Sequence, residues 1–133
     1  MSEERLDLLN EYVKAGEFPM LIKNASPNAF NNSVVINSDI AKSELNGHYE
    51  GITFCPPMWY KELIEKSKNN YCILVIGNIN EISMEEQTKF VEILKYKKIS
   101  TFDLPKNCLI IATCTDLSKN KINEEVYSLL VEI

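Results

Sequence analysis

Unbroken apolar runs predict three buried strands in this chain. Residues 71–77 (YCILVIG) and 107–113 (NCLIIAT) each contain five consecutive apolar residues, and 33–37 (SVVIN) contains a shorter run. A strand covered on both faces has a continuous run of this kind, whereas a half-exposed strand alternates apolar and polar residues. The three segments therefore indicate a parallel sheet that is covered by other elements on each side.

Apolar residues at helical spacing predict helices between and around these strands. The predicted helices cover 3–14, a short segment capped by Ser38 or Asp39 that runs to Leu45, 58–68, a segment that begins at Ser83, and 122–133, which turns into an edge strand at its end. Ser83 and Glu86 form the S-x-x-E pattern of a capping box. The residues expected to face the core are Leu6, Leu9, Tyr12, Val13, Trp59, Leu63, Ile64, Phe90, Val91, Ile93 and Leu94.

The remaining segments have the composition of turns and short strands. Residues 19–23 (PMLIK) predict a further strand, and 24–32 (NASPNAFNN) is rich in asparagine, as turns are. Residues 47–54 are expected to form a loop or a weak strand, and 115–121 a loop. Because strands and helices alternate, the predicted fold class is α/β: a three-layer α/β/α fold with a mainly parallel sheet of about five strands.

Composition indicates one globular domain over residues 1–133. Hydrophobic residues make up 45% and charged residues 25%, which is typical of a folded chain rather than a disordered one. The net charge of -5 argues against nucleic acid or an anionic membrane as the partner. The acidic start is unlike a secretory signal, and no run approaches the roughly 20 apolar residues of a membrane span. The expected location is the cytoplasm.

The four cysteines predict neither disulfides nor a metal centre. Thiols stay reduced in the cytoplasm. No C-x-x-C pair occurs and His48, expected to be an exposed loop residue, is the only histidine, so a zinc site would need ligands scattered along the chain. Cys72 and Cys108 lie within apolar runs and are expected in the core. Cys55 lies in a predicted loop, where it would need a neighbouring base to act as a nucleophile, and the sequence reveals none.

One longer stretch, residues 71–118, contains a series of motifs in a fixed order. An apolar strand is followed by a helix and a second strand, with the motif residues Glu85, Gln87, Phe90, Leu94, Leu104-Pro105 and Ala112-Thr113. This stretch resembles the central part of an AAA+ ATPase core, closest to the MoxR-like and dynein-like branch. The resemblance implies a P-loop NTPase-like fold in which 19–23 precedes the phosphate loop and 71–77 is the Walker B strand. In this reading the chain corresponds to the core alone, and the helical lid that normally follows such a core is expected to be missing.

The residues that bind and hydrolyse ATP in that family do not match. A Walker A loop needs glycines, a lysine and a Ser or Thr for phosphate and Mg²⁺, but residues 24–32 contain neither Gly nor Lys. Gly77-Asn78 stand where Walker B has Asp-Glu, and Cys114 or Thr115 stands at the first sensor position. The single arginine lies near the N-terminus. Because phosphoryl transfer depends on these groups, the chain is predicted to be a degenerate P-loop domain without ATPase activity.

Candidate ligand residues remain where the predicted strands end. In open α/β sheets, ligands bind beyond the carboxyl ends of the strands. The candidates for such a site are Asn24, Asn28, Asn78, Glu81 and Thr115. These stretches are also ordinary turn sequence, so a turn without a ligand is the alternative, and neither a cofactor nor a metal is predicted.

The leading functional hypothesis is a non-catalytic AAA+-like core that acts as a protein-binding or assembly module, associating with itself or with an active ATPase. Two alternatives stay open. One is nucleotide binding without hydrolysis, and the other is a small cytosolic α/β enzyme that uses Cys55 or carboxylates such as Asp39, Glu81 and Asp116. The alternative to the resemblance itself is an unrelated flavodoxin-like or Rossmann-like domain.

Overall fold

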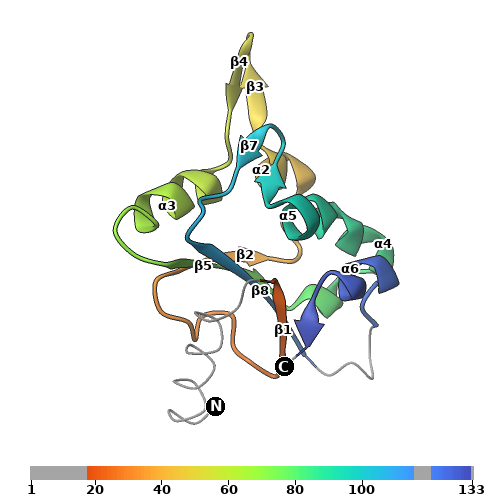
Figure 1. Ribbon diagram of the computed structural model, residues 1–133. Coiled ribbons are helices and arrows are strands. Elements are labelled where there is room, and N and C mark those ends of the chain that lie inside the picture. The colour runs from red at the N-terminus through yellow and green to blue at the C-terminus, as the bar shows by residue number, and fades with distance from the viewer. Residues whose placement is uncertain (1–17, 116–120, 133) are drawn as a thin grey trace.

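A five-stranded sheet forms the centre of the protein in the computed structural model, which describes residues 18–115 and 121–132 (Figure 1). In spatial order its strands are β2 (Ser33–Asn37), β5 (Cys72–Gly77), β8 (Cys108–Cys114), β1 (Met20–Lys23) and β9 (Val131–Glu132). Every pairing between neighbours is parallel. The predicted α/β class with a mainly parallel sheet is therefore confirmed.

The two strands with the longest apolar runs lie side by side inside the sheet. All of β5 is buried, and β8 has a single residue that is not. In their register Cys72 pairs with Cys108 and Ile76 with Ala112. A strand with neighbours on both sides and cover on both faces has no position left for a polar side chain, which explains the unbroken runs.

The described helices belong to one face of the sheet, as their shared core shows. They are α2 (Lys42–Asn46), α3 (Met58–Lys66), α4 (Met84–Gln87), α5 (Val91–Tyr96) and α6 (Glu124–Ser128), with the short 3₁₀ turns η1 (Ile79–Glu81) and η2 (Thr88–Phe90). Trp59 is buried in this core, as predicted, and its indole N–H donates a hydrogen bond of 3.0 Å to the carbonyl oxygen of Leu45. Phe90 and Ile93 are fully buried there as well.

Two helices differ from their predicted form. The helix at Ser83 begins as expected, because the Ser83 hydroxyl accepts a hydrogen bond from the N–H of Glu86, but η2 divides it into α4 and α5. In α3, Ile64 was expected to face the core and is exposed instead. The buried face of this helix is formed by Trp59 and Leu63, which leaves Ile64 at its margin.

The short helix predicted to run to Leu45 begins later than expected. Its first residue is Lys42, and neither Ser38 nor Asp39 caps it. The Ser38 hydroxyl donates instead to the carbonyl oxygen of Asn78, at 2.9 Å. A contact between distant segments thus replaces the local cap.

The other face of the sheet is covered, within the described residues, by segment 24–32. Ala25 and Phe30 of this segment are buried against Val75 and other apolar residues of the sheet. The helix predicted for 3–14 lies outside the described residues. The long segment between β1 and β2 therefore acts as a packing element, although its sequence has the composition of a turn.

Two small hairpins extend from the helical side. They are formed by β3 (His48–Glu50) with β4 (Thr53–Cys55), and by β6 (Lys98–Ile99) with β7 (Phe102–Asp103). The β3–β4 hairpin projects from the body at the top of Figure 1 and replaces the predicted loop or weak strand. Gly51, with φ of 62°, begins its two-residue turn, a position that favours glycine. The Phe54 ring stacks on Phe102 with 5.4 Å between ring centres, which anchors the hairpin to the body.

The C-terminal segment forms a helix and then an edge strand, as predicted. Asn123 caps α6 by accepting hydrogen bonds from the N–H groups of Glu125 and Val126. β9 then pairs with β1 and completes the sheet. Among the described residues, no helix has the length and apolar character needed to cross a bilayer.

Candidate functional site

The five candidate ligand residues lie where strands β1, β5 and β8 end. We call residues 24–32, 77–81 and 113–115 the strand-end region, because parallel strands bring these segments to the same border of the sheet. Within it, Asn24, Asn28, Glu81 and Thr115 are exposed and Asn78 is half-buried.

Asn24 and Asn28 shape the turn that follows β1. Asn24 has a left-handed φ of 55°, which asparagine tolerates better than most residues, and its backbone N–H donates to the carbonyl oxygen of Cys114 at 2.9 Å. The backbone N–H of Asn28 donates to the hydroxyl of Ser26 at 3.4 Å. The first bond continues the pairing of β1 with β8, and the second lies within the turn.

Segment 24–32 closes directly onto the end of β5. A Cβ placed on Gly77 would lie 3.0 Å from Cγ and 3.1 Å from Cβ of Pro27, so the proline ring rests against the glycine backbone. The neighbouring side chains of Ala25 and Phe30 are buried under the sheet. In a phosphate loop, backbone N–H groups enclose an anion. Segment 24–32 instead packs side chains against the sheet.

The lysine that precedes this segment is engaged elsewhere. The Lys23 ammonium forms an ion pair with Glu132 on the neighbouring edge strand β9, and the Tyr127 hydroxyl donates to the same carboxylate. The hydrogen bonds from Lys23 and Tyr127 lower the pKa of Glu132, and the hydrogen bond to Glu132 raises the pKa of Lys23. Lys23 therefore ties β1 to β9 in this structure.

Polar side chains at the strand ends form hydrogen bonds that join the end of β5 to the end of β8. The Asn78 N–H donates to the hydroxyl of Thr113 at 2.9 Å, and Asn78 is also the residue whose carbonyl oxygen accepts from Ser38. The Asn80 side chain is 1% exposed and binds Thr115 three times. Its amide oxygen accepts from the Thr115 N–H (3.0 Å) and hydroxyl (3.2 Å), and its amide nitrogen donates to the Thr115 carbonyl oxygen (3.4 Å).

Few side chains in the strand-end region could bind a metal ion or a phosphate group. Glu81 is the only carboxylate within the strand-end region, and it is exposed on η1 rather than aligned on the strand. Gly77 and Asn78, which the sequence resemblance aligns with the Walker B carboxylates, bring no acidic group to the end of β5. No pair of acids and no lysine is assembled in these described segments.

Three of the four thiols are structural. Cys72, Cys108 and Cys114 are buried in the sheet. Burial raises the pKa of each, and that of Cys108 to about 12. These thiols are therefore protonated and unreactive at neutral pH. The expectation that Cys72 and Cys108 lie in the core is confirmed, and Cys55 is the only cysteine that is partly exposed.

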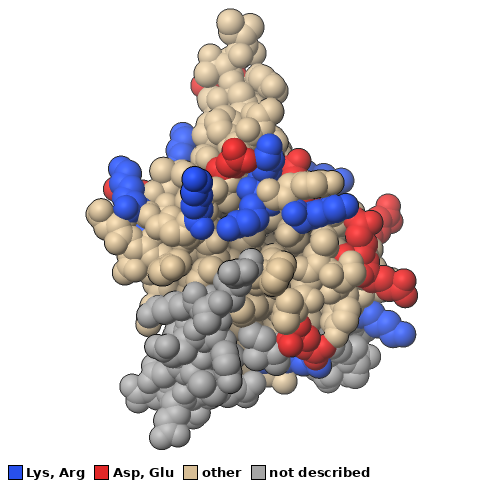
Figure 2. Space-filling view, in the orientation of Figure 1, with Lys and Arg blue, Asp and Glu red and all other residues tan. Residues whose placement is uncertain are grey.

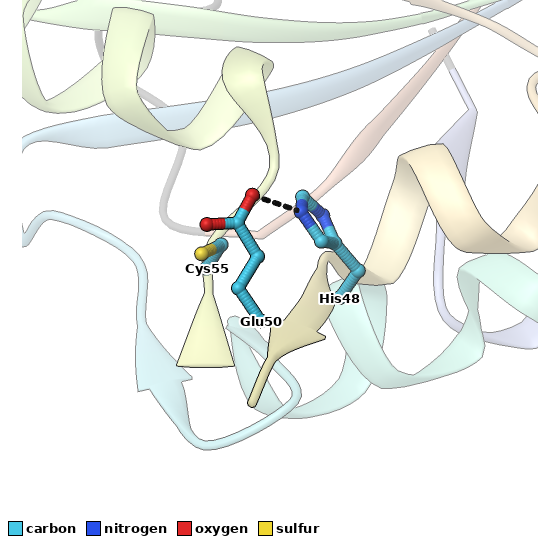
Figure 3. A group of neighbouring side chains, drawn as sticks. All are labelled: His48, Glu50 and Cys55. Carbon is cyan, nitrogen blue, oxygen red and sulfur yellow. Dashed lines mark hydrogen bonds and ion pairs between the residues drawn. The ribbon is translucent and has the colours of Figure 1, made fainter. Parts of the chain in front are cut away.

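A second group of polar side chains gathers on the β3–β4 hairpin. His48 pairs across the hairpin with Cys55, and Glu50 lies two residues further along β3, on the same face. The ligand-type atoms of the three residues all lie within 4.8 Å of one another, and His48 Nε2 is 3.4 Å from Glu50 Oε1. Figure 3 shows the three side chains turned toward each other. We call these residues the hairpin cluster.

A hollow of about 810 Å³ adjoins this cluster. Besides the three cluster residues, Glu44 from α2 and Trp59 and Lys61 from α3 line it. The opposite face of the hairpin is aromatic, since Tyr49 lies 5.1 Å from Phe54 between ring centres. The hairpin thus presents one polar face toward the hollow and one aromatic face.

This cluster was not predicted from the sequence. A zinc site was expected to need ligands scattered along the chain, and 47–54 was expected to form a loop or a weak strand. The available signal was the H-x-E spacing of His48 and Glu50, followed by Cys55 beyond a turn that begins at Gly51. In a hairpin with a two-residue turn, that spacing places all three side chains on one face.

The comparisons with known proteins show a shared fold and little shared sequence. No family model matches the chain, and no curated protein sequence matches it. Among solved structures, it is similar to NtrX from Brucella abortus, a bacterial response regulator with an AAA+ ATPase domain, at a TM-score of 0.61 and 14% identity. A second NtrX structure, in complex with ADP, is similar at a TM-score of 0.53 and 13% identity.

These matches cover 98% and 96% of this chain but only 36% and 34% of NtrX. The chain therefore spans about a third of the length of the protein it resembles. The likeness, together with the parallel sheet, supports the P-loop NTPase-like, AAA+-like fold that the sequence predicted. At this level of identity it shows the fold alone.

Proposed function

We propose that this chain is a P-loop NTPase-like domain that does not hydrolyse ATP and acts by binding another protein chain. The observation that supports the lack of ATP hydrolysis is the contact of Pro27 with Gly77. This contact sets the segment that would form a phosphate loop against the end of β5, and we infer that it leaves no room there for a nucleotide phosphate. Asn80 and Thr115 then fix the strand ends in that closed arrangement.

The β3–β4 hairpin supports the proposed binding of another protein chain. Its tip exposes Ile52 completely and Tyr49 by 70%. Figure 2 shows the projecting hairpin as largely uncharged, with basic side chains gathered below it. Exposed aromatic and aliphatic side chains on a projection suit insertion into an apolar pocket of a partner, because their burial there releases water from apolar surface. The partner is a second copy of the chain or a different protein.

The catalytic half is tested by measuring phosphate release from ATP in the presence of Mg²⁺. The account expects no release above the rate without protein. Release that stops when Mg²⁺ is chelated would contradict it, because phosphoryl transfer needs the metal and charge neutralisation that this site lacks.

The binding half is tested by light scattering on the purified chain and on two variants. Ile52→Ser removes an apolar side chain from the hairpin tip, and Met84→Ser removes one that is 46% exposed on α4. Wild type and Met84→Ser are expected to have a mass above the monomer, or to retain a co-purifying protein at a fixed ratio, and Ile52→Ser to lose it. A wild-type monomer without any partner would contradict the proposal.

A further inference from the structure

The hairpin cluster has the composition of a metal site. His48, Glu50 and Cys55 offer one nitrogen, one oxygen and one sulfur ligand atom, which is a set that Zn²⁺ accepts. Harder cations such as Mg²⁺ and Ca²⁺ prefer sites made of oxygen alone. The identities of the side chains therefore favour zinc over those cations.

The spacing of the ligand atoms is close to what zinc requires. A tetrahedral zinc ion with bonds of about 2.0–2.3 Å holds its ligand atoms roughly 3.3–3.8 Å apart. His48 Nε2 and Glu50 Oε1 are already 3.4 Å apart, and all three atoms lie within 4.8 Å of one another. Glu50 and His48 are exposed, so small rotations of their side chains would complete the approach.

The backbone holds this spacing in place. Gly47, immediately before β3, has φ of 84°, and a Cβ there would lie 2.5 Å from the carbonyl oxygen of Cys55. Only glycine permits the two strands to approach so closely at the base of the hairpin. On the other face, Phe54 stacks on Phe102 and fixes the hairpin to the body. Backbone pairing and aromatic packing thus position the ligands, and the interaction of His48 with Glu50 holds two of them together.

We propose that the hairpin cluster binds one Zn²⁺ through His48, Glu50 and Cys55, with the fourth position open toward the adjoining hollow. Cys55 binds as the thiolate, and its proton is released to solvent when the metal enters. The hollow of about 810 Å³ leaves room for a water or another oxygen donor at the open position. This assignment is independent of the function proposed above, because it concerns neither nucleotide nor the hairpin tip.

The test is a titration of the full chain, without an affinity tag, first with Co²⁺ and then with Zn²⁺. A thiolate-to-cobalt charge-transfer band is expected at one equivalent of Co²⁺, and one equivalent of Zn²⁺ should abolish it. Cys55→Ser should remove the band, because the other three thiols are buried. Loss of one of three ligands in His48→Ala or Glu50→Gln should weaken zinc binding by about tenfold or more, in line with the sensitivity of metal sites to their ligand environment.

Glu65→Gln is the matched control for charge, because Glu65 is exposed on α3 outside the cluster. It should bind zinc as wild type does. Circular dichroism of each variant should match wild type, because β3 and β4 lie outside the five-stranded sheet. Absence of the band in wild type, its persistence in Cys55→Ser, or unchanged zinc affinity in His48→Ala would each overturn the assignment.

Discussion

The strand-end region and the hairpin cluster use polar side chains in opposite ways. At the strand ends, the Asn80 amide is buried and bound to Thr115. On the hairpin, His48 and Glu50 are exposed, and their ligand atoms are turned toward Cys55 beside a hollow. One group of polar residues holds the chain together, and the other remains accessible to a ligand.

The contrast shows that the position of a polar residue in a fold does not tell whether it supports the structure or is accessible to a ligand. In a P-loop NTPase-like fold, the strand ends are where nucleotide chemistry is expected, and here the Pro27 ring packs against the end of β5. The hairpin lies outside the sheet, and it holds the three groups that could bind a metal. Likeness of fold alone therefore does not identify the region of this chain that binds a ligand.

The largest effect is expected for Asn80→Ala, which removes the buried amide from the strand-end region. The variant loses three hydrogen bonds to Thr115, and the free energy of unfolding should fall by about 2 kcal/mol, since a hydrogen bond contributes about 0.5–1.5 kcal/mol. Urea unfolding measures this change. Glu81→Gln, at the exposed neighbour, should change stability by less than about 0.5 kcal/mol. An equal, small effect of both variants would show that the region is not held by the Asn80 contacts.

The next effect is expected for Gly77→Ala, which tests the closing contact itself. The new methyl group would lie 3.0 Å from the Pro27 ring, which must shift slightly to admit it, and overpacking of this kind costs about 1–2 kcal/mol. In a Pro27→Ala background the same substitution should cost less than about 0.5 kcal/mol, since the obstacle is gone. The four proteins form a double-mutant cycle by urea unfolding. An identical cost in both backgrounds would mean that Pro27 does not rest on Gly77.

A smaller effect is expected at the hairpin tip. Ile52 is fully exposed, so Ile52→Ser should leave the free energy of unfolding within about 0.5 kcal/mol of wild type. Thermal unfolding in dilute solution measures this. A larger loss would show that the tip contributes to the core of the free chain, and the contrast between a closed and an accessible region would then be weaker.

The smallest effect is expected for the exposed pair that ties β1 to β9, tested by Glu132→Gln. The pKa of Glu132 is lowered in the folded chain, first by the Lys23 hydrogen bond and then by that of Tyr127. The stability that the carboxylate contributes is therefore complete above its ordinary pKa of 4.5 and is lost as the pH falls through the lowered value. Wild type should unfold at a slightly higher temperature than the variant at pH 7.

The two proteins should converge at strongly acidic pH, where the carboxylate is protonated in both the folded and the unfolded chain. Salt should also reduce the difference, because exposed charges are screened. A difference that grows as the pH falls below 4.5 would contradict this assignment of the pair.

The sheet could be predicted from the sequence because a strand that is buried on both faces consists of consecutive apolar residues. The runs at 71–77 and 107–113 became β5 and β8 with a shift of one residue at most. The capping pattern at Ser83 also located the start of α4, since the cap depends on neighbours in the chain.

The hairpin cluster could not be predicted in the same way. Strands β3 and β4 are three residues long, and most of their side chains are exposed, so burial imposes no apolar run on them. The contact that anchors them to the body is Phe54 stacking against Phe102, which is distant in the sequence. Ser38 failed as a predicted cap for a similar reason, because its partner Asn78 comes from another strand end.

The most direct test of the central claim is the thermal unfolding midpoint of the full chain with increasing ATP, ADP or GTP and Mg²⁺. Binding at 100 times Kd would add about 2.7 kcal/mol of stability and raise the midpoint. If the contact of Pro27 with Gly77 closes the phosphate position, as proposed, none of the three nucleotides should change the midpoint. A saturable rise with any of them would contradict it.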